Sequence, residues 1–391
     1  MPTIRKLPLC LCTILWASFW MEFTVAFSKS DLQQRQHGRR RRLPKKVLIG
    51  YATDCNEKVA TAVRDGVNIV VWSFMEISKE ISTGKINISE NSLNFDLIRQ
   101  MIADLDSEGF VDTVHLVSFG GWNGPHLDTS LTAEHWYEIW KNHVGGTFDG
   151  IDWDLEGHDN LDSQTNTFSV ECLNLMGDIS RLAKEDGYII GMAPPQSYFD
   201  LGRSSFSRSV NLTEPDRLWH SDFHYVGNNV YAYLFSRYGS YIDFVSVQLY
   251  ESYSRAAMSI YHDKVLPGDY LKNFVTSYSE NKGQWYVDFE QDKTLQYASR
   301  NVELPLSKLV IGLANGWAIN EGEKVIFFSS EQIRSPHDQL LQAGVTPRGF
   351  MFWVIGEEGN NGIEYAKDLA SILKPREVQK GASHSSATSD L

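Results

Sequence analysis

The chain has 391 residues, 42% of them hydrophobic, and a formal net charge of −13 at pH 7. Its first 44 residues hold 8 of the 36 Lys and Arg but only 2 of the 49 Asp and Glu, so the remainder carries 28 basic against 47 acidic side chains, a net charge of −19. A surface this acidic disfavours nucleic acid and anionic membranes as partners, and the length allows one large domain.

The N-terminus has the pattern of a secretory signal peptide. A basic pair precedes an apolar run at 7–20, and small residues at 24–26 offer a cleavage site. Because this run is short for a membrane span, residues 1–26 predict a signal peptide and a secreted protein; a membrane anchor and a two-part plastid signal are the alternatives. Residues 27–44 predict a basic disordered linker or pro-segment, whose arginine run at 39–42 is either a processing site or a charged tether.

The cysteine count excludes a disulfide framework. Two of the four cysteines lie within the predicted signal peptide, which leaves Cys55 and Cys172. These two could pair in an exported protein, but two separate buried thiols are the expected state. Asn87 and Asn211 begin acceptor sites for N-glycosylation, which matter only if the chain is secreted.

Eight short β-branched or apolar runs recur along the chain, and helical patterns separate them. Parallel strands joined by crossover helices produce this alternation, and closing eight of them gives a single α/β domain, a (β/α)₈ TIM barrel, at 45–375. A doubly wound open sheet is the alternative, but the first run lacks a glycine-rich phosphate loop after it. The long connections 197–242 and 252–307 predict extra helices or loops, and residues 376–391 predict a disordered tail. The predicted strands are 46–52, 67–74, 113–121, 148–156, 188–196, 243–251, 308–316 and 349–357.

The fourth predicted strand, FDGIDWDLE, carries four acidic side chains. Side chains alternate along a strand, so Asp152, Asp154 and Glu156 share one face and the apolar residues between them share the other. In a barrel the acidic face lines the interior and climbs toward the carboxyl-terminal rim, where barrel active sites lie. Asp149 has the opposite parity and precedes the other three, so we expect it to hold the entrance of the strand.

Three carboxylates about 7 Å apart along one strand cannot all be ionised comfortably in a partly desolvated interior. We expect them to hold shared protons, with at least one raised pKa, which is the condition for a general acid near neutral pH. Glu156 has the longest side chain and lies nearest the rim, so it is the predicted proton donor. The alternatives are a solvated acidic edge strand and a divalent-cation site, and the apolar residues between the acids disfavour an exposed strand.

The spacing Asp149-x-x-Asp152-x-Asp154-x-Glu156 matches in full the DxxDxDxE signature of the chitinases of glycoside hydrolase family 18. The chain resembles this family over about 45–375, across all eight predicted strands. Only about 33 residues separate the seventh and eighth strands, which leaves no room for the small inserted α+β domain of some members, so the chain looks more like the compact, plant-type branch. Three other strands agree with the family through Ser118, Gly120 and Gly121 of an SxGG motif, Gln248 and Tyr250 of the sixth strand, and Trp353 of the eighth.

The resemblance implies hydrolysis of β-1,4-linked N-acetylglucosamine by a substrate-assisted, retaining mechanism. Glu156 would be the general acid and base, Asp154 would orient the acetamido group, and Asp152 would share a proton with Asp154. Tyr250 would hydrogen-bond the acetamido carbonyl, and Trp353 would form the floor under the sugar. The expected partner is chitin or an oligosaccharide containing N-acetylglucosamine, the expected state is a monomer, and neither a metal nor an organic cofactor is implied.

Other aromatic and polar residues at strand ends are further candidates for the substrate cleft. Phe74, Gln196 and Trp122 lie at the ends of predicted strands, and Trp285 is either a stacking platform for another sugar or a packed loop aromatic. Glu251 departs from the family pattern, because many relatives carry Asp or Asn at this position, and the shape of the sugar site is therefore in doubt. Two other functions remain open: an endo-β-N-acetylglucosaminidase that trims N-glycans, and a catalytically weak chitin-binding lectin, although such lectins usually lose the acid.

Overall fold

The computed structural model describes residues 41–144, 146–160, 162–210 and 228–374. Several sequence predictions lie outside these ranges: the signal peptide at 1–26, most of the linker at 27–44, the acceptor Asn211 and the tail at 376–391. None of the helices within the described ranges has the length and apolar composition that a membrane crossing requires.

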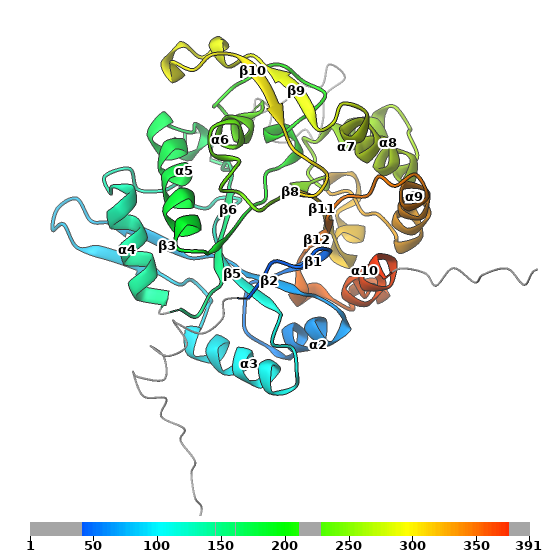
Figure 1. The fold of residues 1–391 in the computed structure, drawn as a ribbon, viewed down its shortest axis with the longest axis horizontal. Coiled ribbons are helices and arrows are strands. Elements are labelled where there is room, and N and C mark those ends of the chain that lie inside the picture. Colours follow the sequence, from blue (N-terminus) through cyan, green and yellow to red (C-terminus); the bar gives the residue numbers. More distant parts are fainter. Residues whose placement is uncertain (1–40, 145, 161, 211–227, 375–391) are drawn as a thin grey trace, which may run out of the picture. The chain divides into compact units, whose positions relative to one another are not determined.

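Eight strands within the described ranges form the barrel that the sequence predicts. They are β1 (Val47–Ala52), β2 (Ile69–Trp72), β5 (Val114–Gly121), β6 (Gly150–Leu155), β7 (Ile189–Met192), β8 (Phe244–Gln248), β11 (Leu309–Ala314) and β12 (Gly349–Trp353). All neighbours in the closed order β1-β12-β11-β8-β7-β6-β5-β2 are parallel. Figure 1 shows the strands at the centre and the helices around them. Every strand lies inside its predicted range, so the (β/α)₈ fold is confirmed.

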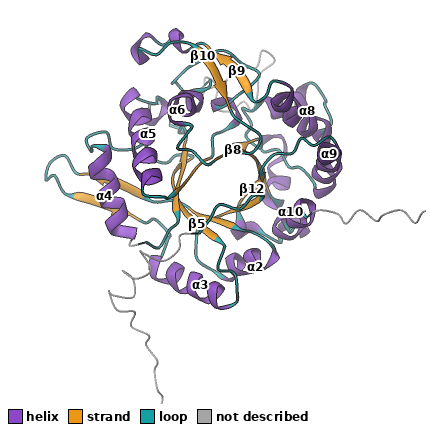
Figure 2. Ribbon diagram, viewed as in Figure 1, coloured by secondary structure: helices purple, strands orange, loops and turns teal. Residues whose placement is uncertain are grey.

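Helices follow the strands and cover the outside of the barrel (Figure 2). Those described are α2 (Glu57–Asp65), α3 (Phe95–Ser107), α4 (Ala133–Val144), α5 (Val170–Glu185), α6 (Val230–Tyr238), α7 (Arg255–Ala257), α8 (Pro267–Glu280), α9 (Ser330–Gln342) and α10 (Tyr365–Leu373). Local sequence fixes several of their starts. Ser169 caps α5 by accepting a hydrogen bond from the Cys172 amide at 3.0 Å, and Ser329 and Gln332 form a reciprocal capping box at α9.

Two short antiparallel hairpins were not predicted from the sequence. One pairs β3 (Glu76–Lys79) with β4 (Ile86–Ser89), and the other pairs β9 (Gln284–Val287) with β10 (Arg300–Glu303). The second hairpin, together with α7 and α8, accounts for the long connection at 252–307, where extra elements were expected. Asn87, an acceptor for glycosylation, lies exposed on β4.

The apolar core has two layers, one inside the barrel and one between the barrel and the helices. Ile49, Val71 and Leu116 belong to the inner layer. Trp153 belongs to the outer layer, where its ring packs 5.8 Å from that of Trp136, and its Nε1 donates to Ser180 Oγ at 2.8 Å. The lower barrel is thus filled by apolar side chains, and the polar residues described below lie above this filling.

The two cysteines in the described part of the chain do not pair. Cys172 is buried and Cys55 is half-buried, and both are free thiols, as the sequence analysis expected. Burial raises the pKa of Cys55 to about 11 and that of Cys172 to about 12, so neither is a reactive thiolate near neutral pH.

Candidate active site

The acidic residues of β6 face the interior of the barrel, as their parity predicts. Asp152, Asp154 and Glu156 are all buried, with exposed fractions of 1%, 4% and 5%. Ile151 and Trp153, which alternate with them, belong to the outer apolar layer. Removing three carboxyl groups from water raises their pKa values unless hydrogen bonds or positive charges compensate, so their partners determine what this site can do.

Asp152, the lowest of the three, is held by two hydroxyl groups from other strands. Its Oδ2 accepts hydrogen bonds from Tyr51 Oη at 2.6 Å and from Ser118 Oγ at 2.9 Å. Burial nevertheless raises the pKa of Asp152 to about 6. Its other oxygen lies over Gly191, where a Cβ atom would approach within 2.6 Å, so glycine leaves the space that this carboxyl occupies.

Asp154 and Glu156 form a hydrogen-bonded pair of carboxyl groups. Gln248 Nε2 donates to Asp154 Oδ1 at 2.8 Å and to the Ala193 carbonyl at 2.6 Å, which fixes the amide beside this pair. Two carboxyl groups can share a hydrogen bond only while one of them holds a proton. In this structure Asp154 shares its hydrogen bond with Glu156, and the hydroxyl groups occupy only Oδ2 of Asp152. Proton sharing between Asp152 and Asp154 stays a prediction.

The pKa of Glu156 is raised well above that of an ordinary glutamic acid. Burial is the largest cause, and the negative charge of Glu251 adds to it, whereas hydrogen bonds from Gln248 and Asp154 act in the opposite direction. Burial also raises the pKa of Asp154, and the charge of Glu156 raises it further. Glu251, the position that departs from the family pattern, thus contributes to the electrostatics of the acid, and burial raises its own pKa to about 7.

Gly120 and Gly121 let two neighbouring parts of the site approach the end of β5. Both have positive φ angles, 111° and 81°, which disfavour residues with a side chain. A Cβ on Gly120 would collide with the backbone of Asp154, and one on Gly121 would lie 2.5 Å from Phe74 Cε2. Glycine at both positions therefore permits the close approach of β6 and Phe74 to the end of β5.

An aromatic group stands beside the carboxyl groups. The ring of Trp353 stacks on Phe74 with centroids 5.9 Å apart and is tilted against Tyr51 at 5.6 Å. Trp353 is only partly buried, and it also packs in a small apolar cluster with Tyr250 and Trp317. Trp317 Nε1 donates to the main-chain carbonyl of Trp353 at 2.9 Å, which holds the Trp317 indole against the end of β12. Such a group offers an apolar face to a sugar ring.

Other candidates from the sequence have different surroundings. Gln196 is buried. Its Nε2 donates to Tyr270 Oη at 2.7 Å, and its Oε1 accepts from the Ala256 amide at 2.9 Å. Both ends of its side-chain amide are therefore hydrogen-bonded within the protein. Trp285 is buried against Phe199 at 5.0 Å, which favours the packed loop aromatic over a stacking platform. Trp122 remains 41% exposed near the site.

Two contributors to the site were missed in the sequence. Tyr51 lies next to the last residue of β1 with its side chain inside the barrel. No local sequence pattern distinguishes it from a core tyrosine. His126, in the loop after β5, lies with its Nε2 2.8 Å from the Glu156 carbonyl oxygen, and only the fold brings these two residues together. Over the described ranges, no group of three or more His, Cys, Asp or Glu residues is arranged to hold a metal ion.

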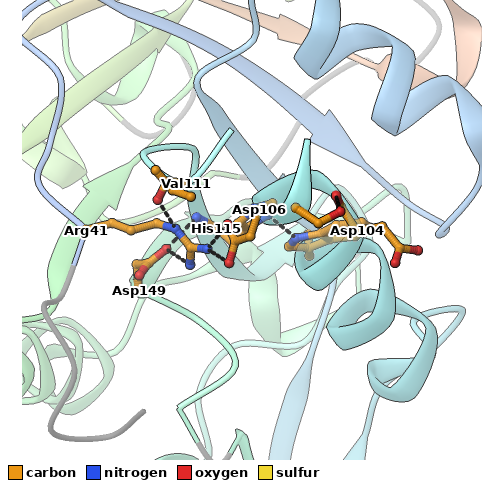
Figure 3. Close-up of polar contacts among 8 residues, drawn as sticks. Arg41, Asp104, Asp106, Val111, His115 and Asp149 are labelled. Carbon is orange, nitrogen blue, oxygen red and sulfur yellow. Dashed lines mark hydrogen bonds and ion pairs between the residues drawn. The ribbon is translucent and has the colours of Figure 1, made fainter. Parts of the chain in front are cut away.

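Asp149, the first acid of the motif, lies at the opposite end of β6 and binds an arginine from the basic N-terminal run. Its Oδ2 accepts a hydrogen bond from the His115 amide at 2.8 Å and lies 3.4 Å from Arg41 Nη1. The same guanidinium binds both oxygens of Asp106, at 2.7 and 2.9 Å, and its Nε donates to the Val111 carbonyl at 3.0 Å (Figure 3). Arg41, which falls in the predicted linker at 27–44, is thus bonded to residues of the barrel. Asp149 lies at the entrance of β6, and its role in holding that entrance stays a prediction.

Comparisons with known proteins support the fold. No family model and no curated protein sequence matches the chain. Among solved structures, a family 18 chitinase from Chromobacterium violaceum is similar, with a TM-score of 0.56, 17% identity, and coverage of 86% of this chain and 85% of that chain. A family 18 chitinase from Pseudoalteromonas aurantia has a TM-score of 0.50 and 17% identity, with coverage of 84% of this chain and 100% of that chain. A fungal family 18 endo-β-N-acetylglucosaminidase has a TM-score of 0.50 and 15% identity, with coverage of 86% of this chain and 100% of that chain. The chain thus shares the barrel fold of these enzymes.

Replacing Arg41 with Ala is expected to destabilise the protein by about 1–3 kcal/mol, because Asp149 then lies buried without its cation. Arg42→Ala is the matched control, since Arg42 is exposed, and it should change stability by less than about 0.5 kcal/mol. Urea unfolding measures both. The peptide bond after Arg41 should also resist trypsin in the folded protein, as mass spectrometry would show; rapid cleavage there would contradict a bound Arg41.

Asp152→Asn is expected to reduce the pH dependence of stability. From the ordinary Asp value of 3.8 up to about 6, the unfolded chain releases a proton that folded Asp152 retains, so this group lowers stability as pH rises through that window. Unfolding free energies measured at pH 4, 5, 6 and 7 should fall less steeply in the variant. Asp112→Asn, at an exposed position, should keep the wild-type slope, and an equal slope for Asp152→Asn would contradict the assignment.

Proposed function

We propose that this chain is a retaining glycoside hydrolase of family 18 that cleaves β-1,4-linked N-acetylglucosamine in chitin or chitooligosaccharides. The observation that carries the proposal is the buried, hydrogen-bonded pair of Asp154 and Glu156 on the inner face of β6. A protonated carboxyl group retained toward neutral pH is what a glycosidase needs to protonate its leaving group. The likeness of the fold to family 18 hydrolases and the complete DxxDxDxE spacing support the same activity.

In the first step, Glu156 donates its proton to the glycosidic oxygen. The acetamido carbonyl oxygen of the sugar on the non-reducing side of the bond attacks its own anomeric carbon, and the protonated sugar on the other side leaves as the glycosidic bond breaks. The product of this step is an oxazolinium ion. Asp154, relieved of its hydrogen bond to Glu156, orients the acetamido N–H and balances the positive charge. The hydroxyl groups of Tyr51 and Ser118 keep Asp152 in place below it.

In the second step, Glu156 acts as a base. It takes a proton from water while the water oxygen attacks the anomeric carbon from the side that the leaving group vacated. The bond to the acetamido oxygen breaks, the acetamide is restored, and Glu156 regains its proton. Two inversions at one carbon give retention of the anomeric configuration.

The neighbouring side chains supply binding and orientation. The Tyr250 hydroxyl donates a hydrogen bond to the acetamido carbonyl. Burial raises the pKa of Tyr250 well above the ordinary value, so this hydroxyl stays protonated. Trp353, stacked on Phe74, presents an apolar face to the sugar. Gln248 holds Asp154 by its amide.

A second candidate is trimming of N-glycans by endo-β-N-acetylglucosaminidase activity. The likeness to the fungal endo-β-N-acetylglucosaminidase favours it, because the same acid pair would serve both substrates. A lectin is less well supported, since the acid is retained. We also propose that the chain is exported; mass spectrometry of the mature N-terminus tests this, and a chain that begins at Met1 in the cell interior would contradict it.

Glu156→Gln should lower turnover of chitotetraose by about 10²–10⁴-fold or more, because the amide cannot donate the proton. Binding, measured by calorimetry, should survive, since the amide keeps the shape of the side chain. Glu134→Gln, at an exposed position of α4, is the matched control and should retain full activity. Unchanged turnover in Glu156→Gln would remove Glu156 from the mechanism.

Chitotetraose and a high-mannose glycopeptide, offered in parallel to the purified protein, should separate the three functions. Cleavage of chitotetraose with retained anomeric configuration, followed by NMR, is the expected result. Cleavage of the glycopeptide alone would favour the N-glycan enzyme, and binding without cleavage would favour the lectin. An inverted product would exclude the oxazolinium route.

A further inference from the structure

The backbone that carries Glu156 continues beyond the end of β6 and is held by groups from other segments. Three successive carbonyl oxygens accept hydrogen bonds there: Leu155 from Tyr231 Oη at 3.0 Å, Glu156 from His126 Nε2 at 2.8 Å, and Gly157 from the Asn123 amide at 3.1 Å. Because the β6 ladder ends at Leu155, these contacts take over the restraint that strand pairing supplies lower down.

The loop that follows β5 provides two of these three donors and is itself tied to the loop that follows β6. Asn123 Oδ1 accepts from the Asp159 amide at 2.8 Å, and Asn123 Nδ2 donates to Asp159 Oδ2 at 2.8 Å. Trp122 Nε1 donates to the other oxygen of Asp159 at 3.1 Å. The two loops therefore form one hydrogen-bonded unit, and Glu156 lies at its base.

His126 is the member of this unit that touches the backbone of Glu156 directly. Its ring packs against Phe168 with centroids 4.2 Å apart, which fixes its orientation. Burial lowers the pKa of His126 to about 4, so the ring is neutral near pH 7. A carbonyl oxygen can only accept a hydrogen bond, so the single N–H proton of the neutral ring lies on Nε2. This N–H donates a hydrogen bond to the main-chain carbonyl of Glu156.

We propose that His126 is a positioning residue, which holds the main chain of Glu156 so that the carboxyl group meets the glycosidic oxygen. His126 contacts no reacting atom and acts only through Glu156. This inference rests on the proposed function. Its physical basis is the steep dependence of proton transfer on geometry, because a displacement of about 1 Å can lower a rate by about a hundredfold.

Two substitutions separate the hydrogen bond from the packing of the ring. His126→Phe keeps an aromatic ring against Phe168 and removes the donor, whereas His126→Gln keeps a donor and removes the ring. We expect kcat on chitotetraose to fall at least about tenfold in His126→Phe with KM within about twofold, and to recover most of that loss in His126→Gln. His135→Phe, at an exposed position of α4, is the matched control and should leave both constants unchanged. An equal loss in both His126 variants, or a loss confined to KM, would overturn the assignment.

Amide hydrogen exchange tests the same contact without substrate. A peptide covering 151–160 should exchange faster in His126→Phe than in the wild type and return to the wild-type rate in His126→Gln. Unchanged exchange in His126→Phe overturns the inference whether or not the protein cleaves chitotetraose. Absence of cleavage by the wild type, with the expected exchange pattern, would instead contradict the proposed function and leave the role of His126 in holding the backbone intact.

Discussion

The desolvation of three carboxyl groups on the inner face of one strand is the constraint on which the site depends. Each group is almost fully buried, so the cost of ionisation is met by protonation and by hydrogen bonds. The three carboxyl groups therefore differ in their hydrogen-bond partners. Asp152 is bonded to two hydroxyl groups, whereas Asp154 and Glu156 are bonded to each other and to Gln248. Proton retention near the rim is thus a product of the fold.

The partners of these acids come from strands far apart in the sequence. Tyr51 lies on β1, Ser118 on β5 and Gln248 on β8, and only closure of the barrel brings them to β6. These hydrogen bonds therefore form in the closed barrel and not in a partly formed sheet. At the other end of β6 the charge balance is different, because the guanidinium of Arg41 pairs with both Asp149 and Asp106. One strand thus begins with a compensated charge and ends with a pair that must keep a proton.

Much of this arrangement could be predicted from the sequence because it depends on local periodicity. Alternation along β6 separated Asp152 from Trp153, and the eight apolar runs located all eight barrel strands. The partner of Asp152 could not be predicted, since Tyr51 precedes it by 101 residues and has no local distinguishing pattern. Gln196 and Trp285 lay at suitable points in the chain, but their burial among α7, α8 and the loops depends on packing that periodicity does not encode. The strands of the two hairpins are as long as β2 and β7, but they are largely exposed or half-buried and lack the continuous apolar run that located the barrel strands.

The unpaired state of Cys55 and Cys172 bears on how this barrel responds to thiol reductants. Hydrogen bonds, ion pairs and apolar packing stabilise the described domain, and no cross-link between these two thiols contributes. The stability of the described domain should therefore be insensitive to thiol reductants.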